Sequence, residues 1–360
     1  MPPTPAPDLA IEASDLVKTY RGGVRALDGL SFSVATGTVF GLLGPNGAGK
    51  STAVKILTTL SRQDAGTARV MGIDVARHPD RVRRTIGCVA QKSGVDVDAT
   101  GRENLILQGQ AYGMGGRRLR QRVGELLERL GLAEAADRVA RTYSGGMQRK
   151  LDIAIGLVHQ PQMLFLDEPT TGLDPEARAD MWQEITRLSG QEGLTILLTT
   201  HYLEEADHLC DRLAIIDRGR VVVEGTPDGL KGELRGDAVH VELGEPESNG
   251  RLRGVLGHLD DVAEVVVEGR SLHARAASGA TAVPAVLQAL ESAGIAVTSV
   301  TVARPSLDDV YLRYTGRAFA EADQEGAKAG RDTGRGGAGR GGAGPDAKDA
   351  KDAKVKEVTR

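Results

Sequence analysis

Gly44-Pro45-Asn46-Gly47-Ala48-Gly49-Lys50-Ser51 decides the fold of this chain, and it follows an apolar run that starts at Thr38. The spacing is that of a phosphate-binding loop between a strand and a helix. Glycines let backbone N–H groups turn toward a phosphate chain, and the following helix points its positive end at the same anion. Lys50 can then reach the β- and γ-phosphates, and Ser51 can offer its hydroxyl to Mg²⁺. The stretch therefore predicts a nucleoside triphosphate site, and the flanking strand and helix disfavour a plain glycine-rich turn.

Polar side chains follow three apolar runs further along the chain. Met163-Leu-Phe-Leu166 ends in Asp167 and Glu168, the run from Ile86 ends in Gln91, and the run from Thr195 to Thr200 ends in His201. In a parallel sheet such positions face the bound nucleotide. Asp167 suits Mg²⁺, Glu168 suits activation of water, and Gln91 suits either. Alone, Asp167 and Glu168 would be read as a solvated acidic turn and His201 as structural.

Two alternating segments, 9–20 and 27–34, predict an antiparallel β-subdomain ahead of the loop. Tyr20 ends the first segment, where its ring could stack on a base, although an exposed strand-end tyrosine is the commoner explanation. Apolar spacings of three and four over 102–132 predict a helical insert within the nucleotide-binding fold. Ser144, followed by Gly145 and Gly146, has the pattern of a helix N-cap that could bind an anion.

The second half of the chain has a different pattern. A hairpin over 212–224 closes the first domain near Leu230, and 237–316 predicts the β-α-β-β-α-β order of a ferredoxin-like domain. A short helix after Pro305 carries an apolar face, which we expect to pack either on its own ferredoxin-like domain or on a second copy or a membrane subunit. The segment 321–360 lacks apolar anchors and is predicted to be disordered, as is the lead-in 1–8.

Composition excludes several classes of protein. The chain has 360 residues, of which 40% are hydrophobic and 26% charged, as in an ordinary globular protein. Its 45 basic and 49 acidic residues give a net charge of -4, which offers no general attraction to nucleic acid. Cys88 and Cys210 show no metal or redox spacing, so we expect reduced core residues. No apolar stretch is long enough to span a membrane, and the N-terminus does not resemble a signal peptide.

With these residues in place, the chain resembles the ATP-binding subunit of an ABC transporter, and within that family the daunorubicin-resistance type of drug exporter. The most specific mark is Tyr143-Ser-Gly-Gly-Met-Gln148, similar to the Leu-Ser-Gly-Gly-Gln signature and placed between the loop and Asp167. Thr100-Gly-Arg-Glu-Asn-Leu105 and Pro305-Ser-Leu-Asp-Asp-Val-Tyr-Leu312 resemble the drug-export branch. The chain departs from the family at Tyr143 and Met147, and it lacks the aromatic-proline pair often found before the glutamine.

The resemblance implies a P-loop NTPase core of α/β class over 9–230, with an antiparallel β-subdomain and a helical subdomain at about 92–160, followed by an α+β accessory domain at 237–316. It implies ATP and Mg²⁺ as cofactors, with Ser51, Gln91 and Asp167 at the metal and Glu168, His201 and Gln91 as catalytic residues. The nucleotide-binding residues implied are Tyr20, Gly44, Pro45, Asn46, Gly47, Ala48, Gly49, Lys50, Ser51, Thr52, Ser144, Gly145, Gly146 and Asp174. Two copies would sandwich two ATP molecules, with Ser144, Gly145 and Gly146 supplied by the opposite copy.

The resemblance also implies partners and a place in the cell. The expected partners are a separate integral-membrane permease and a second copy of the chain, with no nucleic acid, at the cytoplasmic face of the membrane. Efflux of a drug or hydrophobic natural product, consistent with antibiotic self-resistance, is the implied function. Alternatives are another class of ABC transporter, such as an importer, or a soluble ABC ATPase that acts on a ribosome or a nucleic-acid complex. The latter usually carries two cassettes or a long coiled coil, whereas this chain has one cassette and no sustained heptads.

Overall fold

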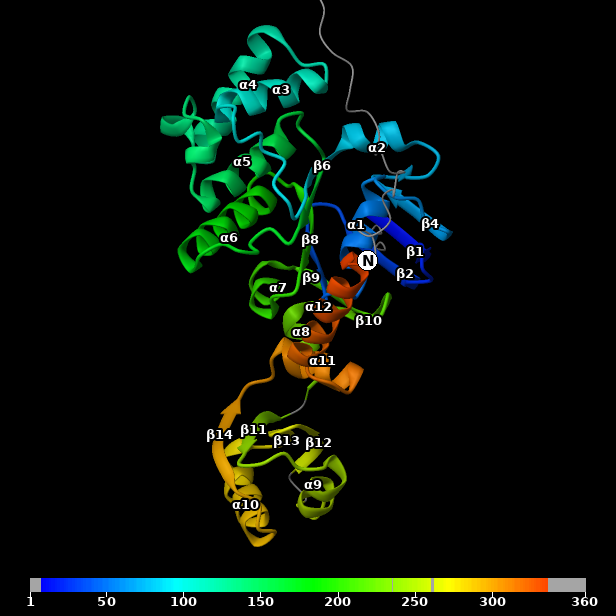
Figure 1. Cartoon of the computed structure of the whole chain (residues 1–360), viewed down its shortest axis with the longest axis vertical. Helices are drawn as coiled ribbons and strands as arrows, with labels where there is room; N and C mark the ends of the chain where they lie inside the picture. Colours follow the sequence, from blue (N-terminus) through cyan, green and yellow to red (C-terminus); the bar gives the residue numbers. More distant parts are fainter. Residues whose placement is uncertain (1–7, 235, 260–261, 336–360) are drawn as a thin grey trace, which may run out of the picture.

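A computed structural model describes residues 8–234, 236–259 and 262–335 of the chain (Figure 1). This part of the chain folds around three β-sheets and the helices that cover them. Within these residues, no helix combines the length and the apolar character needed to cross a membrane. The predicted lead-in 1–8 lies almost wholly outside the described residues.

The central sheet positions the nucleotide site. Its strand order is β10-β9-β3-β8-β7-β6, and only β10 runs antiparallel to its neighbour. The bounds are β3 Val39–Leu43, β6 Ile86–Val89, β7 Met163–Asp167, β8 Thr195–Thr200, β9 Arg212–Asp217 and β10 Arg220–Gly225. Every residue of β3, β7 and β8 is buried, as expected for parallel strands covered on both faces. The carboxyl ends of these strands therefore meet at one edge, next to the phosphate loop.

A second sheet has the order β2-β1-β4-β5 and is antiparallel throughout. Its strands are β1 Leu9–Thr19, β2 Arg25–Ala35, β4 Ala65–Val70 and β5 Ile73–Asp74. Its inward residues, such as Ile11 and Leu30, share one apolar core with Ile56 and Leu57 of the helix α1, Lys50–Leu57. This confirms the predicted β-subdomain and fixes it against the helix that follows the phosphate loop.

Helices cover the central sheet and form the predicted insert. The insert contains α3 Gly101–Ala111, α4 Gly116–Arg129 and α5 Gly145–Leu157, with two 3-10 turns, Ala133–Ala135 and Ala140–Thr142, between α4 and α5. A capping box between Thr100 and Glu103 starts α3. The other helices are α2 Pro79–Thr85, α6 Pro175–Gly190, α7 Leu203–Leu209 and α8 Pro227–Gly232. Of the two cysteines predicted in the core, Cys210 is buried, but Cys88 on the edge strand β6 is exposed.

The accessory domain has its own core around a third sheet, at the opposite end of the molecule from α3 and α4 (Figure 1). Its elements are β11 Asp237–Leu243, α9 Asn249–Leu256, β12 Val262–Glu268, β13 Ser271–Ala276, α10 Gly279–Ser292 and β14 Val297–Ala303. The strand order is β12-β13-β11-β14, with every pair antiparallel. The predicted β-α-β-β-α-β, ferredoxin-like arrangement is confirmed.

The helix after Pro305 returns to the part of the chain that carries the phosphate loop. This helix, α11 Leu307–Thr315, begins at a capping box between Ser306 and Asp309. Its apolar residues Leu307 and Tyr311 are buried in the core that contains the insert helices of the same chain. The prediction that this apolar face packs on the ferredoxin-like domain, on a second copy or on a membrane subunit is therefore wrong. The helix therefore joins the accessory domain to the part of the same chain that holds the phosphate loop and the helical insert.

The prediction of disorder from Glu321 is wrong for the first part of that segment. The structure has a further helix, α12 Phe319–Arg335, and Phe319 and Ala322 lie in the same apolar core as Tyr311. The phenyl ring of Phe319 packs edge-on against Tyr311, with the ring centroids 4.9 Å apart. Composition does not reveal these anchors, because two apolar side chains suffice when a preformed surface receives them. Residues 336–360 lie outside the described residues.

Truncation of Tyr311 should therefore destabilise the protein and not merely its assembly. The side chain is fully buried, and its hydroxyl donates to Asp217 Oδ1 at 3.2 Å. We expect Tyr311→Ala to lower the free energy of unfolding by about 3–5 kcal/mol, the range for removal of a buried aromatic side chain. Denaturant unfolding followed by circular dichroism measures this change. Tyr314→Ala is the matched control, because Tyr314 is 42% exposed; equal stability of both variants would contradict the packing of α11.

Candidate nucleotide-binding and hydrolysis site

The phosphate loop links the end of β3 to the start of α1, as the sequence predicts. Gly49 occupies the N-cap position of α1 with φ 113°, a conformation that residues with a side chain rarely adopt. A Cβ on Gly49 would also lie 2.6 Å from the carbonyl oxygen of Ala26 on β2. Both constraints require glycine here, and they leave the backbone amides at the start of α1 open to an anion.

Lys50 lies inside the loop. Its side chain is 4% exposed, and Nζ donates to the carbonyl oxygens of Gly44 and Pro45 at 2.5 and 3.1 Å. Nζ also lies 3.9 Å from Glu168 Oε1. Burial lowers the pKa of Lys50, while the charges of Glu168, Asp323 and Asp167 oppose that shift. The ammonium group is thus held at the place where the sequence predicts a phosphate.

The residues beside Lys50 fit a magnesium ion. Ser51 Oγ donates to Asp167 Oδ1 at 3.2 Å, and Thr199 Oγ1 donates to the same oxygen at 2.5 Å. A carboxylate and a hydroxyl at the mouth of a phosphate loop are oxygen donors of the kind that Mg²⁺ binds, so these residues could hold the ion. Sequence reasoning identified Ser51 and Asp167 but missed Thr199, which occupies the neighbouring strand at the matching register position.

Glu168 is surrounded by the other predicted catalytic residues. Gln91 Nε2 donates to its Oε2 at 2.8 Å, and His201 Nδ1 lies 3.3 Å from its Oε1. Thr171 also donates to Oε2, at 3.3 Å. The structure thus brings Gln91, Glu168 and His201 together from three strand ends. Gln91 contacts Glu168 directly, and its role at the metal stays a prediction.

The backbone conformation and the pKa of Glu168 both differ from those of an ordinary glutamate. Its φ is 49°, the left-handed region that non-glycine residues seldom occupy and that concentrates at functional sites. Burial raises the pKa of Glu168, but the hydrogen bond and charge of His201, together with Lys50 and Thr171, outweigh burial and hold the pKa below its ordinary value. The side chain is therefore a carboxylate at neutral pH, as a group that polarises water must be.

A buried arginine binds the backbone of the segment that carries Asp167 and Glu168. Arg149, on α5, is 8% exposed and donates to four carbonyl oxygens, those of Ala90, Asp167, Glu168 and Pro169. It fixes the ends of β6 and β7 relative to each other. Sequence reasoning missed it, although it follows the Ser-Gly-Gly motif by only three residues, because a charged residue on a helix is ordinarily read as solvated.

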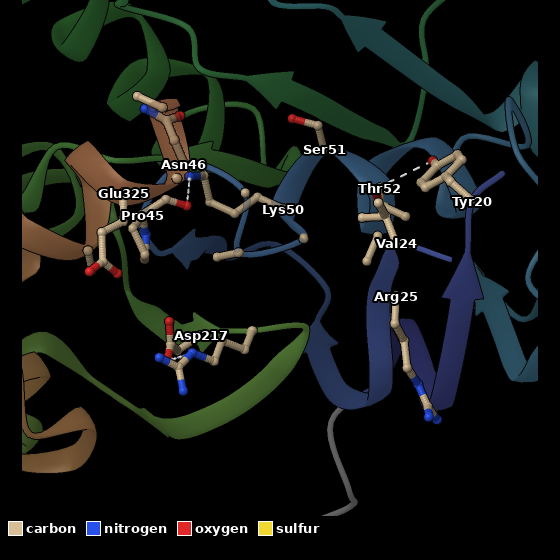
Figure 2. Close-up of a pocket in the computed structure, with 18 of the residues that line it drawn as sticks. Tyr20, Val24, Arg25, Pro45, Asn46, Lys50, Ser51, Thr52, Asp217 and Glu325 are labelled. Carbon is tan, nitrogen blue, oxygen red and sulfur yellow. Dashed lines mark hydrogen bonds and ion pairs between the residues drawn. The ribbon is translucent and has the colours of Figure 1, made fainter. Parts of the chain in front are cut away.

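A cavity of about 750 Å³ opens above the loop (Figure 2). Tyr20 stands at its rim, 39% exposed, with its hydroxyl 3.5 Å from Thr52 Oγ1. Pro45 through Thr52 and Glu168 line the cavity as predicted, and the wall also includes Asp217 and Arg218 from the hairpin, which sequence reasoning did not single out. The cavity therefore combines a phosphate-binding floor with an aromatic side chain at the edge.

Four of the predicted nucleotide-binding residues lie at helix N-termini outside the phosphate loop. Ser144 caps α5 by accepting from Met147 N, with Gly145 and Gly146 in the first turn of that helix. Asp174 caps α6 in the same way, by accepting from Ala177 N at 2.8 Å. These residues are not among those that line the cavity of the described chain. Their role in contacting nucleotide stays a prediction.

A phosphate loop, a strand that ends in Asp167 and Glu168, and a helical insert with a Ser-Gly-Gly cap together define an ATP-binding cassette ATPase. Residues 27–171 match the ABC transporter family, and 225–315 match the C-terminal domain of DrrA1-3-like ATP-binding proteins. The chain is 47% identical over 308 residues to the daunorubicin resistance ATP-binding protein DrrA2 of Streptomyces coeruleorubidus, covering 85% of this chain and 95% of that one. It is 44% identical to the daunorubicin/doxorubicin resistance ATP-binding protein DrrA of Streptomyces peucetius, with 89% and 97% coverage.

Solved structures agree with this assignment. An ATP-binding cassette solved as a dimer in a post-hydrolysis state with ADP and Pi has a TM-score of 0.55 and 27% identity, covering 60% of this chain and 98% of that one. The chain belongs to the ABC transporter family of ATP-binding proteins, in the branch of the daunorubicin and doxorubicin resistance proteins. It is an ATP-binding subunit and an ATPase.

Proposed function

We propose that this chain powers the export of a drug or hydrophobic natural product through a separate membrane permease. The observation that carries the enzymatic part is the position of Glu168, an ionised carboxylate held by Gln91 and His201 and 3.9 Å from the ammonium of the phosphate loop. The drug-export part rests on the identity of 42–47% with relatives named for daunorubicin or doxorubicin resistance.

The residues take the following roles in this proposal. The loop amides and Lys50 bind the phosphate chain, Tyr20 stacks on the adenine, and Ser51 and Asp167 hold Mg²⁺. Bound Mg²⁺, held by these two residues, would neutralise the negative charge that develops during phosphoryl transfer. Glu168 orients and deprotonates the attacking water, and His201 and Gln91 keep the carboxylate in place.

A homodimer completes the site. We propose that Ser144, Gly145 and Gly146 of one copy contact the γ-phosphate bound to the loop of the other, because the N-terminus of α5 offers amides and a positive dipole end. The dimeric state of the solved cassette with ADP and Pi supports this arrangement. The proposed units are an ATP-binding domain at 9–230, with its helical subdomain at about 92–160, and an accessory domain at 237–316.

Membrane association should depend on the permease. Expressed alone, the chain should be recovered in the supernatant after a salt wash of the membrane fraction. Co-expressed with the permease, it should pellet with the membrane fraction. We expect it to bind at the cytoplasmic face of the membrane. A protein with about six hydrophobic spans in the neighbouring reading frame is the partner to use. Stable membrane recovery without any permease would contradict the proposal.

The export function has a direct test in the same cells. Cells that carry both proteins should survive higher daunorubicin concentrations than cells that carry the permease with a Lys50→Ala variant of this chain. Inside-out vesicles from the first cells should accumulate the drug when ATP is added. Equal survival and equal accumulation in both strains would contradict daunorubicin export.

A further inference from the structure

The C-terminal helix α12 lies on the phosphate loop (Figures 1 and 2). The backbone N–H of Asn46 donates to Asp323 Oδ1 at 2.8 Å, across 277 residues of sequence. Three residues further along α12, Gly326 approaches the loop so closely that a Cβ added to it would lie 1.6 Å from the carbonyl oxygen of Asn46. A carboxylate thus accepts a hydrogen bond from a backbone N–H of the loop, and the helix backbone packs against the loop itself.

Two groups of contacts hold α12 in this position. Phe319 and Ala322 are buried, and they pack into the core beside Tyr311. Arg317 connects the helix to the central sheet: its guanidinium donates to Asp217 Oδ1, at the end of β9, and to Glu325 Oε2, both at 2.7 Å. Both Arg317 and Glu325 line the nucleotide cavity. The helix is therefore anchored by apolar burial at its start and by an ion-pair bridge at the cavity.

The chemistry of Asp323 matches that of a phosphate oxygen. A phosphate loop binds anions through backbone N–H groups and a lysine, and a carboxylate is an anion with hydrogen-bond acceptors of similar reach. Asp323 accepts from one of these N–H groups, and its charge also acts on the Lys50 ammonium. A phosphate chain that fills the loop requires the same amide and the same space.

We propose that α12 is a built-in competitor of ATP, in which Asp323 takes the place of a phosphate oxygen at Asn46 N and the helix must leave the loop before the nucleotide can fill it. The proposal rests on the proposed function, because the loop must be the ATP site. The apparent dissociation constant then equals the intrinsic one divided by the fraction of molecules with α12 released. A helix bound to the loop in about 90–99% of molecules weakens apparent ATP affinity by about 10- to 100-fold.

The test uses the full chain with three single substitutions. Gly326→Ala places a methyl group where there is no space and favours the helical state of α12 itself, so it should lift the helix without unfolding it. Asp323→Ala removes the carboxylate. Gln324→Ala is the matched control, because Gln324 lies between these residues with an exposed side chain. We expect the first two to bind MgATP about tenfold more tightly or better by isothermal titration calorimetry, with Gln324→Ala equal to the parent.

A second measurement reads the helix directly. Hydrogen exchange of peptides that cover 319–327 should accelerate when saturating MgATP is added to the parent, and Gly326→Ala should show fast exchange without ATP. MgATP affinity that is the same in the parent, Gly326→Ala and Asp323→Ala overturns the proposal, as does unchanged exchange in α12 when ATP binds. If neither the parent nor Gly326→Ala binds MgATP at all, the assignment of the loop as the ATP site fails first, and the two failures are thereby distinguished.

Discussion

Lys50→Ala is expected to abolish ATP hydrolysis, with a fall in kcat of about 10²- to 10³-fold or more, as for the loss of one preorganised donor in other enzymes. The ammonium is buried in the loop and lies 3.9 Å from Glu168 Oε1. It is therefore placed to stabilise the negative charge that develops on the phosphate during transfer. MgATP affinity should fall as well, because Lys50 contacts the phosphates before and during transfer. Phosphate release assays and calorimetric titration with MgATP measure the two effects.

The control for this variant lies on the same helix. Lys55→Ala removes an exposed lysine in the last turn of α1 and should leave turnover within about twofold of the parent, because a surface charge far from the reacting atoms is weakly coupled to them. Lys50→Ala should keep the fold of the parent by circular dichroism, since Lys50 lies in the phosphate loop and contributes no apolar side chain to the cores. Near-parent turnover in Lys50→Ala would show that the loop is not the hydrolytic site.

Glu168→Gln should give a chain that binds MgATP and pairs but turns over very slowly. Glutamine keeps the size of the side chain but cannot accept the proton of the attacking water, and general-base removal typically costs about 10²–10⁴-fold in rate. Because hydrolysis releases the dimer in the proposed mechanism, the variant should elute as a dimer in size-exclusion chromatography with ATP, whereas the parent should not. Binding affinity and dimer formation thus separate this variant from Lys50→Ala.

Glu176→Gln is the matched control for this substitution. Glu176 is exposed in the first turn of α6, so its amide should change neither turnover nor oligomeric state. The melting temperature of Glu168→Gln provides a second check. It should equal that of the parent, because glutamine takes the place of glutamate at the same backbone conformation, φ 49°. If Glu168→Gln turns over normally and stays monomeric with ATP, Glu168 is not the catalytic residue and another carboxylate takes that role.

The sequence by itself predicted the parts of this protein that depend on local chemistry. The loop from Gly44 to Ser51 has a glycine at each position where the backbone must turn, and the buried strands show as unbroken apolar runs that end in Asp167 and Glu168. Pro305 predicted the start of the short helix α11. Alternation of apolar residues predicted the order of the accessory domain. Each of these signals is carried by neighbours within a few residues.

The contacts between residues that lie far apart in the sequence could be found only in the tertiary structure. Arg149 contacts the ends of two strands, and Asp217 receives Tyr311 and Arg317 from about 100 residues away, pairings that leave no local pattern. Phe319 and Ala322 order a segment of otherwise disorder-prone composition, because α11 and the core already present a surface that receives them. The contact of Asp323 with Asn46 has the same origin: a carboxylate near the end of the chain meets a loop near its start only because burial of α11 brings them together.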